Sequence, residues 1–366
     1  MDFTAGEAEL EAARLAAHIF SAAGRPDVTS DAVDAAADLD LSLWKELGQA
    51  GLLSLALPAE LGGEGLGVQA TAAVLTEAGR HAARIPALAT LALGVLPVAR
   101  GASAELRRQL LAGVAEGETI LTAAMREPSD PLPSAPATIA RLTGESGTVS
   151  GVKVGVPYAA AARWILVPAT TAAGDPVVAV VEPDADGLWC QRTRSSSGLP
   201  EYTIRLDDSP ILHVLDGCSV AELNDLALAG ACAVADGVLA GALELTTEHI
   251  RSREQFGRPL ATFQAVAQQI ADVYATARTL HLAAVSAGWQ LDTGRDAGRA
   301  VDVAAYWLAE HGPPALRICH HLHGGLGMDI TYPLPRYSAL MTDLAAFVGG
   351  AAYRIDRLGA REGTGG

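Results

Sequence analysis

The stretch RSREQFGRPLATFQAVAQQIADVY, residues 251–274, joins two helical patterns through a break that sets unusual residues at fixed offsets. Arg253 stands three residues before Phe256, and GRP then interrupts the helix before Phe263 and Gln264. One interpretation is structural, with Arg253 at a helix C-terminus, where the dipole favours a cation, and Phe256 in the core. The other is a ligand site, in which Arg253 binds phosphates, Phe256 packs on an aromatic ring and Gln264 offers an amide. The residue types alone do not decide between the structural and the ligand-binding interpretation.

Helical patterns dominate the region around this stretch. Residues 264–292 place apolar side chains at alternating steps of four and three, which is the stripe of a bundle helix. Residues 221–252 are strongly apolar, and we expect separate helical pieces at 296–311 and 313–322. A last helix is expected near 338–361. The predicted C-terminal domain is therefore an α-helical bundle.

The N-terminal part of the chain predicts further helices. Apolar residues recur at helical spacing in 6–24, 40–52, 67–83 and 105–117. The segment LALPAELGGEGLG, residues 55–67, is rich in glycine and predicts a turn.

Between these helical regions the amino-acid composition changes. Pro, Gly, Ser and Thr become frequent, and short β-branched runs occur at 147–156, 163–169, 176–183 and 201–208. We therefore expect a mostly α protein with a central antiparallel β domain. The predicted divisions are an N-terminal α-helical domain (1–118), a middle β domain (119–215) and a C-terminal bundle (216–366).

Composition limits the possible functions. The 366 residues carry a net charge of −16, which argues against a nucleic-acid surface. No run approaches eighteen uninterrupted apolar residues, and the start MDFTAGEAELEAAR is acidic and polar, so we expect no membrane span and a cytoplasmic protein. The four cysteines have no paired spacing and are expected to be reduced.

A second unusual stretch, ICHHLHGGLGMDITYPLPRY (318–337), puts three histidines beside three glycines. A metal site is disfavoured, because His320 and His321 cannot share one helix face and no acidic or cysteine cluster is placed to complete the ligand set. The simple interpretation is a helix C-terminus that ends at Gly324 and Gly325. The same glycines would also let a ligand approach the backbone closely.

Taken together, these stretches resemble the acyl-CoA dehydrogenase family. REQFGRPLATFQ resembles its REQFG-x-P-x-x-x-F-Q signature, and HGGLGMDITYPLPR resembles its HGG-x-G and YPL-x-R segment. LWKELGQAGLLSLALPAELGGEGLG, residues 43–67, resembles the family's N-terminal motif. The resemblance covers nearly the whole chain in the order α-helical domain, β domain, α-helical bundle.

The resemblance implies an FAD-dependent oxidoreductase that acts on an acyl-CoA thioester and passes electrons to a transfer acceptor. In the family, FAD binds between the β domain and the bundle, and the bundles assemble as tetramers. Carried over, Arg253 reaches the FAD pyrophosphate of a neighbouring subunit, with Phe256 and Gln264 beside it. Gly324 and Gly325 would lie along the adenosine half. His321 stands where the family usually has Gln and can still donate a hydrogen bond.

The resemblance leaves the catalytic base unassigned. The chemistry needs a carboxylate that removes a proton α to the thioester while flavin N5 takes hydride from the β carbon. At the two places where the family supplies Glu, this chain has Val348 and Gly349, or Ala227. Asp225 lies two residues from the second place and is a weak candidate, since a carboxylate there is more often a solvated helix-start residue.

The β domain departs from the family as well. The stretch MREPSDPLPS (125–134) keeps Glu127 and Pro128 of a T-E-P motif but has Arg126 for Thr. In KVGVP (153–157), Gly155 and Pro157 replace the Trp and Thr of a K-x-W-I-T segment that packs on the flavin. Each departure implies the loss of a contact to the isoalloxazine face.

These departures resemble subunits of actinobacterial α2β2 acyl-CoA dehydrogenases that act on steroid side chains. The first hypothesis is that the chain is such a subunit and acts on a bulky acyl-CoA. Arg253 would then bind the FAD of a neighbouring subunit, and a homologous partner would supply the base. The second is a self-sufficient homotetramer with an unusual base. The third is a scaffold or acyl-CoA-binding subunit without chemistry of its own.

Overall fold

The computed structural model describes residues 6–23, 39–144 and 146–363. Its N-terminal region is built from short helices. These are α1 (Glu7–Ala23), α3 (Leu41–Gln49), α4 (Val68–Arg80), the π-helical segment η2 (Leu88–Val95), α5 (Leu96–Gly101) and α6 (Ala104–Leu110). The four predicted helices are present, although Gly24, at the end of the first, lies outside the described residues. The apolar segment that forms η2 and α5 was missed, because it is buried almost all round and has no amphipathic period.

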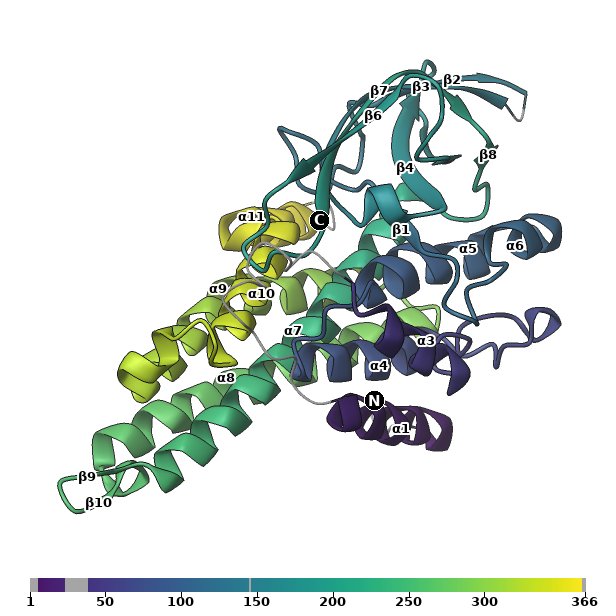
Figure 1. Cartoon of the computed structure of the whole chain (residues 1–366). Helices are drawn as coiled ribbons and strands as arrows, with labels where there is room; N and C mark the ends of the chain where they lie inside the picture. The colour runs from purple at the N-terminus through teal and green to yellow at the C-terminus, as the bar shows by residue number, and fades with distance from the viewer. Residues whose placement is uncertain (1–5, 24–38, 145, 364–366) are drawn as a thin grey trace.

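An eight-stranded sheet follows and lies at one end of the helical body (Figure 1). Its strands are β1 (Leu121–Ala123), β2 (Ile139–Thr143), β3 (Ser146–Pro157), β4 (Trp164–Thr171), β5 (Pro176–Val181), β6 (Leu188–Thr193), β7 (Glu201–Ile211) and β8 (His213–Val214). The strand order is β6-β7-β3-β2-β4-β5-β8, with β1 beside β4. The neighbours are antiparallel except that β1 and β2 both run parallel to β4, so the sheet is mixed rather than antiparallel throughout.

The C-terminal region is a bundle of long helices. It comprises α7 (Val220–Ser252), α8 (Gln264–Asp292), α9 (Gly298–His323), α10 (Leu334–Phe347) and α11 (Gly350–Gly363). A small hairpin, β9 (Glu254–Gln255) and β10 (Arg258–Pro259), followed by the short turn η4 (Leu260–Thr262), joins α7 to α8. The hairpin lies at the end of the molecule that is remote from the sheet (Figure 1).

Two sequence predictions about these helices were wrong. Residues 298–323 form one helix rather than two pieces, and Pro313 and Pro314 lie inside it. Conversely, the single last helix is divided, because Gly349 and Gly350 both adopt positive φ between α10 and α11. Glycine takes this conformation without the steric cost that other residues meet.

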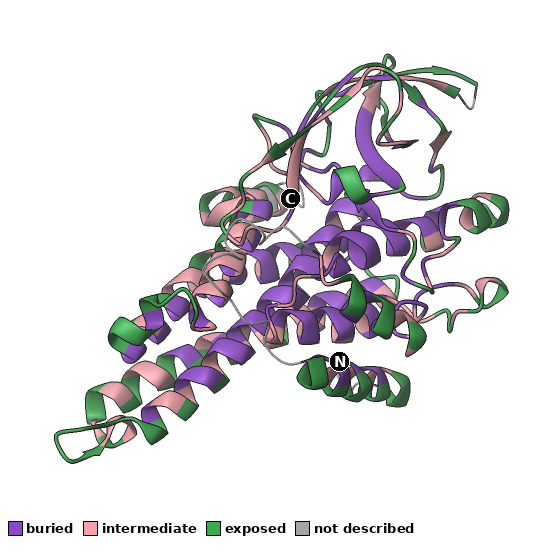
Figure 2. Ribbon diagram, viewed as in Figure 1, coloured by how far each residue is buried: buried purple, intermediate pink, exposed green. Residues whose placement is uncertain are grey.

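The helices of the N- and C-terminal regions share one hydrophobic core, in which α4 packs along α7. Within α7 a window of mean hydropathy 1.9 is long enough to cross a membrane, but 89% of it is buried inside the protein. This helix is therefore the central core helix of the bundle (Figure 2). The sheet carries a second, smaller core. The predicted divisions after residues 118 and 215 fall in the connections before β1 and after β8.

Candidate functional site

The connection between α7 and α8 projects into solvent. Arg253 ends α7 in extended conformation, and Glu254 to Arg258 are all exposed (Figure 2). Phe256 and Gly257, at the turn of the hairpin, have φ of +54° and +74°, which is the pattern of a tight two-residue turn. Positive φ is uncommon for a bulky aromatic residue, and the Phe256 side chain is 91% exposed. The expectation of a core phenylalanine is therefore excluded.

The start of α8 lies against this turn. The Phe256 and Phe263 rings meet edge to face at 6.2 Å, and the Arg258 guanidinium lies 4.1 Å from the centre of the Phe263 ring. The Leu260 N–H donates to the Arg253 carbonyl at 2.9 Å. Gln264 is the first residue of α8 and is exposed. Arg253, Phe256 and Gln264 thus occupy one end of the α7–α8 pair.

The histidine and glycine stretch meets the same end of the bundle. The ring of His249, one turn before Arg253, stacks on the ring of His323 at 4.4 Å. Gly324 follows with φ of +60°, and a side chain at Gly324 or Gly325 would meet open space. The structure therefore brings together two stretches that are about 70 residues apart in the chain. We refer to Arg253, Phe256, Gln264 and the backbone at 324–325 as the hairpin end.

The histidines here have separate roles. His321 is exposed on α9, whereas His320 hydrogen-bonds the Ser338 hydroxyl at 2.5 Å. Burial lowers the pKa of His249, and the nearby Arg253 charge lowers it further. Burial also lowers the pKa of His323. Across the described part of the chain, no group of His, Cys, Asp and Glu is placed to hold a metal ion. The stacking of His249 on His323 was not predicted, because no local pattern marks a contact between distant segments.

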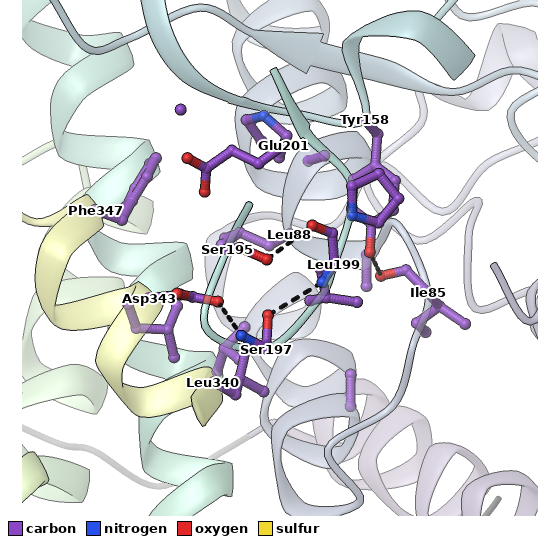
Figure 3. Close-up of a pocket in the computed structure, with 18 of the residues that line it drawn as sticks. Ile85, Leu88, Tyr158, Ser195, Ser197, Leu199, Glu201, Leu340, Asp343 and Phe347 are labelled. Carbon is purple, nitrogen blue, oxygen red and sulfur yellow. Dashed lines mark hydrogen bonds between the residues drawn. The ribbon is translucent and has the colours of Figure 1, made fainter. Parts of the chain in front are cut away.

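A separate cavity lies where the sheet meets the helices (Figure 3). Its volume is about 110 Å³. Its apolar walls come from the segment after α4, from α7 and from α10; among them are Ile85, Leu88, Val234, Leu344 and Phe347. The sheet contributes polar groups, including Arg126 and Glu201. The cavity therefore combines an apolar interior with two opposite charges on one wall.

Beneath that wall, Glu127 and Lys153 form a buried ion pair at 2.8 Å. Their side chains are 4% and 0% exposed. The Glu127 carboxylate also accepts hydrogen bonds from the Ala137 N–H and from the Thr138 N–H and hydroxyl. Burial would raise the pKa of Glu127, but the Lys153 charge and these bonds together lower it. The pair fixes the segment that carries Arg126 against β3.

Arg126 and Glu201 converge over Gly155. A β carbon at Gly155 would lie 2.8 Å from Arg126 Nη1 and 3.1 Å from Glu201 Oε1. Gly155 has φ of +62°, so a side chain there would be both strained and obstructed. The Arg126 side chain is accommodated because residue 155 is glycine, and the two departures from the family pattern are thus physically coupled. Glu201 was missed from the sequence because no motif marks it.

No carboxylate replaces the missing base at the places that the resemblance indicated. Val348 and Ala227 are fully buried. A side chain at Gly349 would approach Pro131 to 2.7 Å. Asp225 does not line the cavity and instead lies 3.9 Å from Arg361.

The helical–sheet–helical architecture, with a cavity at the junction and an exposed cationic hairpin, defines the acyl-CoA dehydrogenase class of fold. Family models for the "Acyl-CoA dehydrogenase, N-terminal domain" and the "Acyl-CoA dehydrogenase, C-terminal domain" match residues 8–118 and 222–354. The chain belongs to the acyl-CoA dehydrogenase family. This confirms the predicted family and fold, and places the chain among FAD-dependent oxidoreductases.

Individual relatives support a narrower grouping. The chain is 45% identical over 344 residues to "Acyl-CoA dehydrogenase FadE28" of Mycobacterium tuberculosis, covering 93% of this chain and 98% of the relative. Among solved structures it is similar to the "Tcur3481-Tcur3483 steroid ACAD", with 36% identity, a TM-score of 0.91 and coverage of 99% and 100%. It is also similar to the "ChsE4-ChsE5 complex from Mycobacterium tuberculosis", with 30% identity, a TM-score of 0.90 and full coverage of both chains.

The residues present fit one half of an FAD molecule and not the other. The hairpin end offers an exposed cation that has no partner in the described part of the chain, an exposed aromatic ring and an open glycine backbone, all of which suit a pyrophosphate and a nucleoside. At the cavity, Pro157 has no N–H to donate, and Arg126 fills the space over Gly155. This cavity therefore lacks the contacts to a flavin ring that the family motif would supply.

Proposed function

We propose that this chain is a subunit of a heteromeric FAD-dependent acyl-CoA dehydrogenase that desaturates the α,β bond of a bulky acyl-CoA. Its hairpin end contacts an FAD that is held by a homologous partner subunit, and the partner supplies the catalytic base. The observation that carries the proposal is Arg253. Its guanidinium has no hydrogen-bond or ion-pair partner among the described residues, although it stands beside an exposed, strained Phe256.

The relatives support the assembly and the substrate class. One similar structure is the ChsE4-ChsE5 complex, and another is a steroid ACAD. A partner-dependent arrangement explains how a chain can retain the hairpin end and yet lack a cavity for the flavin ring. It also explains why neither place for the family's base holds a carboxylate.

Each residue of the hairpin end has a proposed role. FAD, when bound, supplies the hydride acceptor. Arg253 binds the pyrophosphate through its planar donor fork, and Gln264 donates from the start of α8. Phe256 covers an aromatic part of the cofactor. Gly324 and Gly325 allow close approach of the nucleotide, and His321 donates a hydrogen bond from the outer face of α9.

The remaining assignments follow from this role. Electrons leave through a transfer acceptor, and the four cysteines, all free in the structure, suit the reducing cytoplasm. A self-sufficient homotetramer finds no support in the position of Asp225, which faces Arg361. A scaffold without a cofactor would not explain why Arg253, which has no partner among the described residues, stands beside a strained, exposed aromatic residue.

The test is the flavin content of Arg253→Ala in a complex with a homologous partner subunit. The substitution removes the charge-assisted bonds to the pyrophosphate, so we expect most of the visible flavin absorbance to be lost while the complex stays intact. Arg251→Ala is the matched control, because Arg251 is exposed at the same end of α7. Full flavin content in Arg253→Ala would contradict the proposal.

A further inference from the structure

We propose that the cavity between the sheet and α10 binds a small, neutral, largely apolar alcohol of about the size of phenol, whose hydroxyl bridges Arg126 and Glu201. This site is separate from the hairpin end. It requires neither FAD nor acyl-CoA, so it goes beyond the role proposed above and stands or fails independently of it.

The first support is the gap between the two charged groups. Arg126 and Glu201 form no ion pair with each other, and within the described ranges neither side chain has another hydrogen-bond partner; Arg126 Nε is buried without one. Because both groups approach one point over Gly155, Nη1 and Oε1 are separated by no more than about 6 Å, the span of two hydrogen bonds through one oxygen. A bridging hydroxyl would pair with Nη1 of Arg126 and with the Glu201 carboxylate.

The second support is the apolar space beside this gap. The carboxylate of Glu201 points toward the side of the cavity that Phe347 closes (Figure 3). Ile85, Leu88 and Val234 line the space, whose volume is about 110 Å³. An engineered apolar cavity of about 150 Å³ binds benzene, so a single ring is the largest group that this cavity can take, and it enters only with a modest expansion of the walls.

The charges define the polar group of the ligand. A carboxylate would face Glu201, with Asp343 as a second acid on the cavity wall, and an ammonium would face Arg126. A hydroxyl accepts from the guanidinium and donates to the carboxylate, and therefore satisfies both without adding charge. Burial raises the pKa of Glu201, Arg126 opposes this effect, and Asp343 adds to it. A donated hydrogen bond would stabilise the charged carboxylate.

A route to the cavity is present. A second, smaller hollow shares Ala83, Ser197, Leu199 and Leu340 with the cavity, so the segment 195–199 lies between the two. Asp343 accepts hydrogen bonds from the N–H groups of Ser196 and Ser197 at 2.8 Å. Movement of this segment would join the two hollows and widen the cavity.

The experiment is calorimetric titration of the full chain, in the complex in which it purifies, with phenol, benzene and benzoate. We expect phenol to bind at least about tenfold more tightly than either of the others, because only phenol satisfies both charged groups. Arg126→Met and Glu201→Leu should each weaken phenol binding about tenfold and leave benzene unchanged. Arg141→Met, an exposed arginine of the same sheet, is the matched control and should change nothing.

Two results would overturn the proposal. One is phenol binding no tighter than benzene in the wild-type complex, which requires no variant to fold. The other is unchanged phenol binding in both cavity variants, which would locate the alcohol elsewhere. Glu201→Gln provides a variant of the same shape if Glu201→Leu is unstable. The flavin content of Arg253→Ala does not enter either result.

Discussion

At the residue scale, the buried pair of Glu127 and Lys153 makes a strong prediction about stability. Glu127→Gln leaves the Lys153 ammonium buried without its countercharge, so we expect a loss of about 3–5 kcal/mol in the free energy of unfolding. The measurement is denaturant unfolding at neutral pH. Glu182→Gln, which removes a partly exposed pair with Arg163, should cost less than about 1 kcal/mol.

The pH dependence of this pair follows from the lowered pKa of Glu127. A carboxyl whose folded pKa lies below its ordinary value of 4.5 contributes stability above that value and loses it as pH falls through the folded pKa. The difference between wild type and Glu127→Gln should therefore shrink in acid. A difference that stays constant from pH 7 to strong acid would show that the carboxylate charge is not the cause.

The contribution of Asp225 to stability depends on pH with the opposite sign. Burial raises its pKa from 3.8 to about 6, Arg361 opposes the shift, and Asp302 and Asp296 add to it. Its contribution to stability is complete below pH 3.8 and is lost as pH rises through about 6, because the buried carboxyl must then ionise. Asp225→Asn should raise the free energy of unfolding at pH 7 by about 1–3 kcal/mol. Asp272→Asn, exposed on α8, is the control, and an equal effect of both would refute the argument.

Some residues of the candidate sites could be predicted from the sequence and others could not. Arg253, Phe256 and Gln264 could be selected because they stand at fixed offsets around a turn, and the structure places them at one exposed end. Glu201 and His249 could not, because their neighbours Arg126 and His323 come from distant segments and no local period marks such a contact. The coupling of Arg126 with Gly155 is visible only once both residues share one wall.

At the element scale, periodicity predicted the long helices, and exceptions arose where tertiary packing overrides local signals. α9 continues through Pro313 and Pro314 because buried residues before and after them, such as Leu308 and Ala315, face the same core. β6 was missed because it is an edge strand whose residues are largely exposed, so no alternation of apolar and polar residues marks it.

The turn between α10 and α11 provides a test of these elements. Gly349 and Gly350 both have positive φ, but only a side chain at Gly349 would meet neighbours, with Pro131 at 2.7 Å and Tyr353 at 2.8 Å. Gly350→Ala should cost about 1–2 kcal/mol from backbone strain alone. Gly349→Ala should cost a further 1–3 kcal/mol, roughly, from overpacking. Thermal unfolding of the two variants measures the difference. An equal loss of stability in both would mean that Pro131 moves aside at no energetic cost.

At the scale of the whole molecule, the tripartite order was predictable because composition and period change at two places along the chain. The shared core of the N- and C-terminal helices was not, because packing of α4 on α7 joins elements more than 130 residues apart. The proposed division of FAD contacts between subunits also belongs to this scale. The hairpin lies at the end of the bundle remote from the sheet (Figure 1), whereas the cavity lies where the sheet meets the helices, so the two sites occupy separate parts of the chain.

This separation predicts the flavin stoichiometry of the assembly. Because this chain's own cavity lacks the family's flavin contacts, the proposed complex with a homologous partner should contain about half as many flavins as polypeptide chains. The measurement is released flavin against protein concentration, in the complex and in this chain purified alone, which should contain none. The cavity variant Leu344→Trp is the control, since it fills the cavity of this chain and should leave the flavin content of the complex unchanged. One flavin for every chain would show that the cavity opens to accept the ring, and would restore the self-sufficient enzyme as the better description.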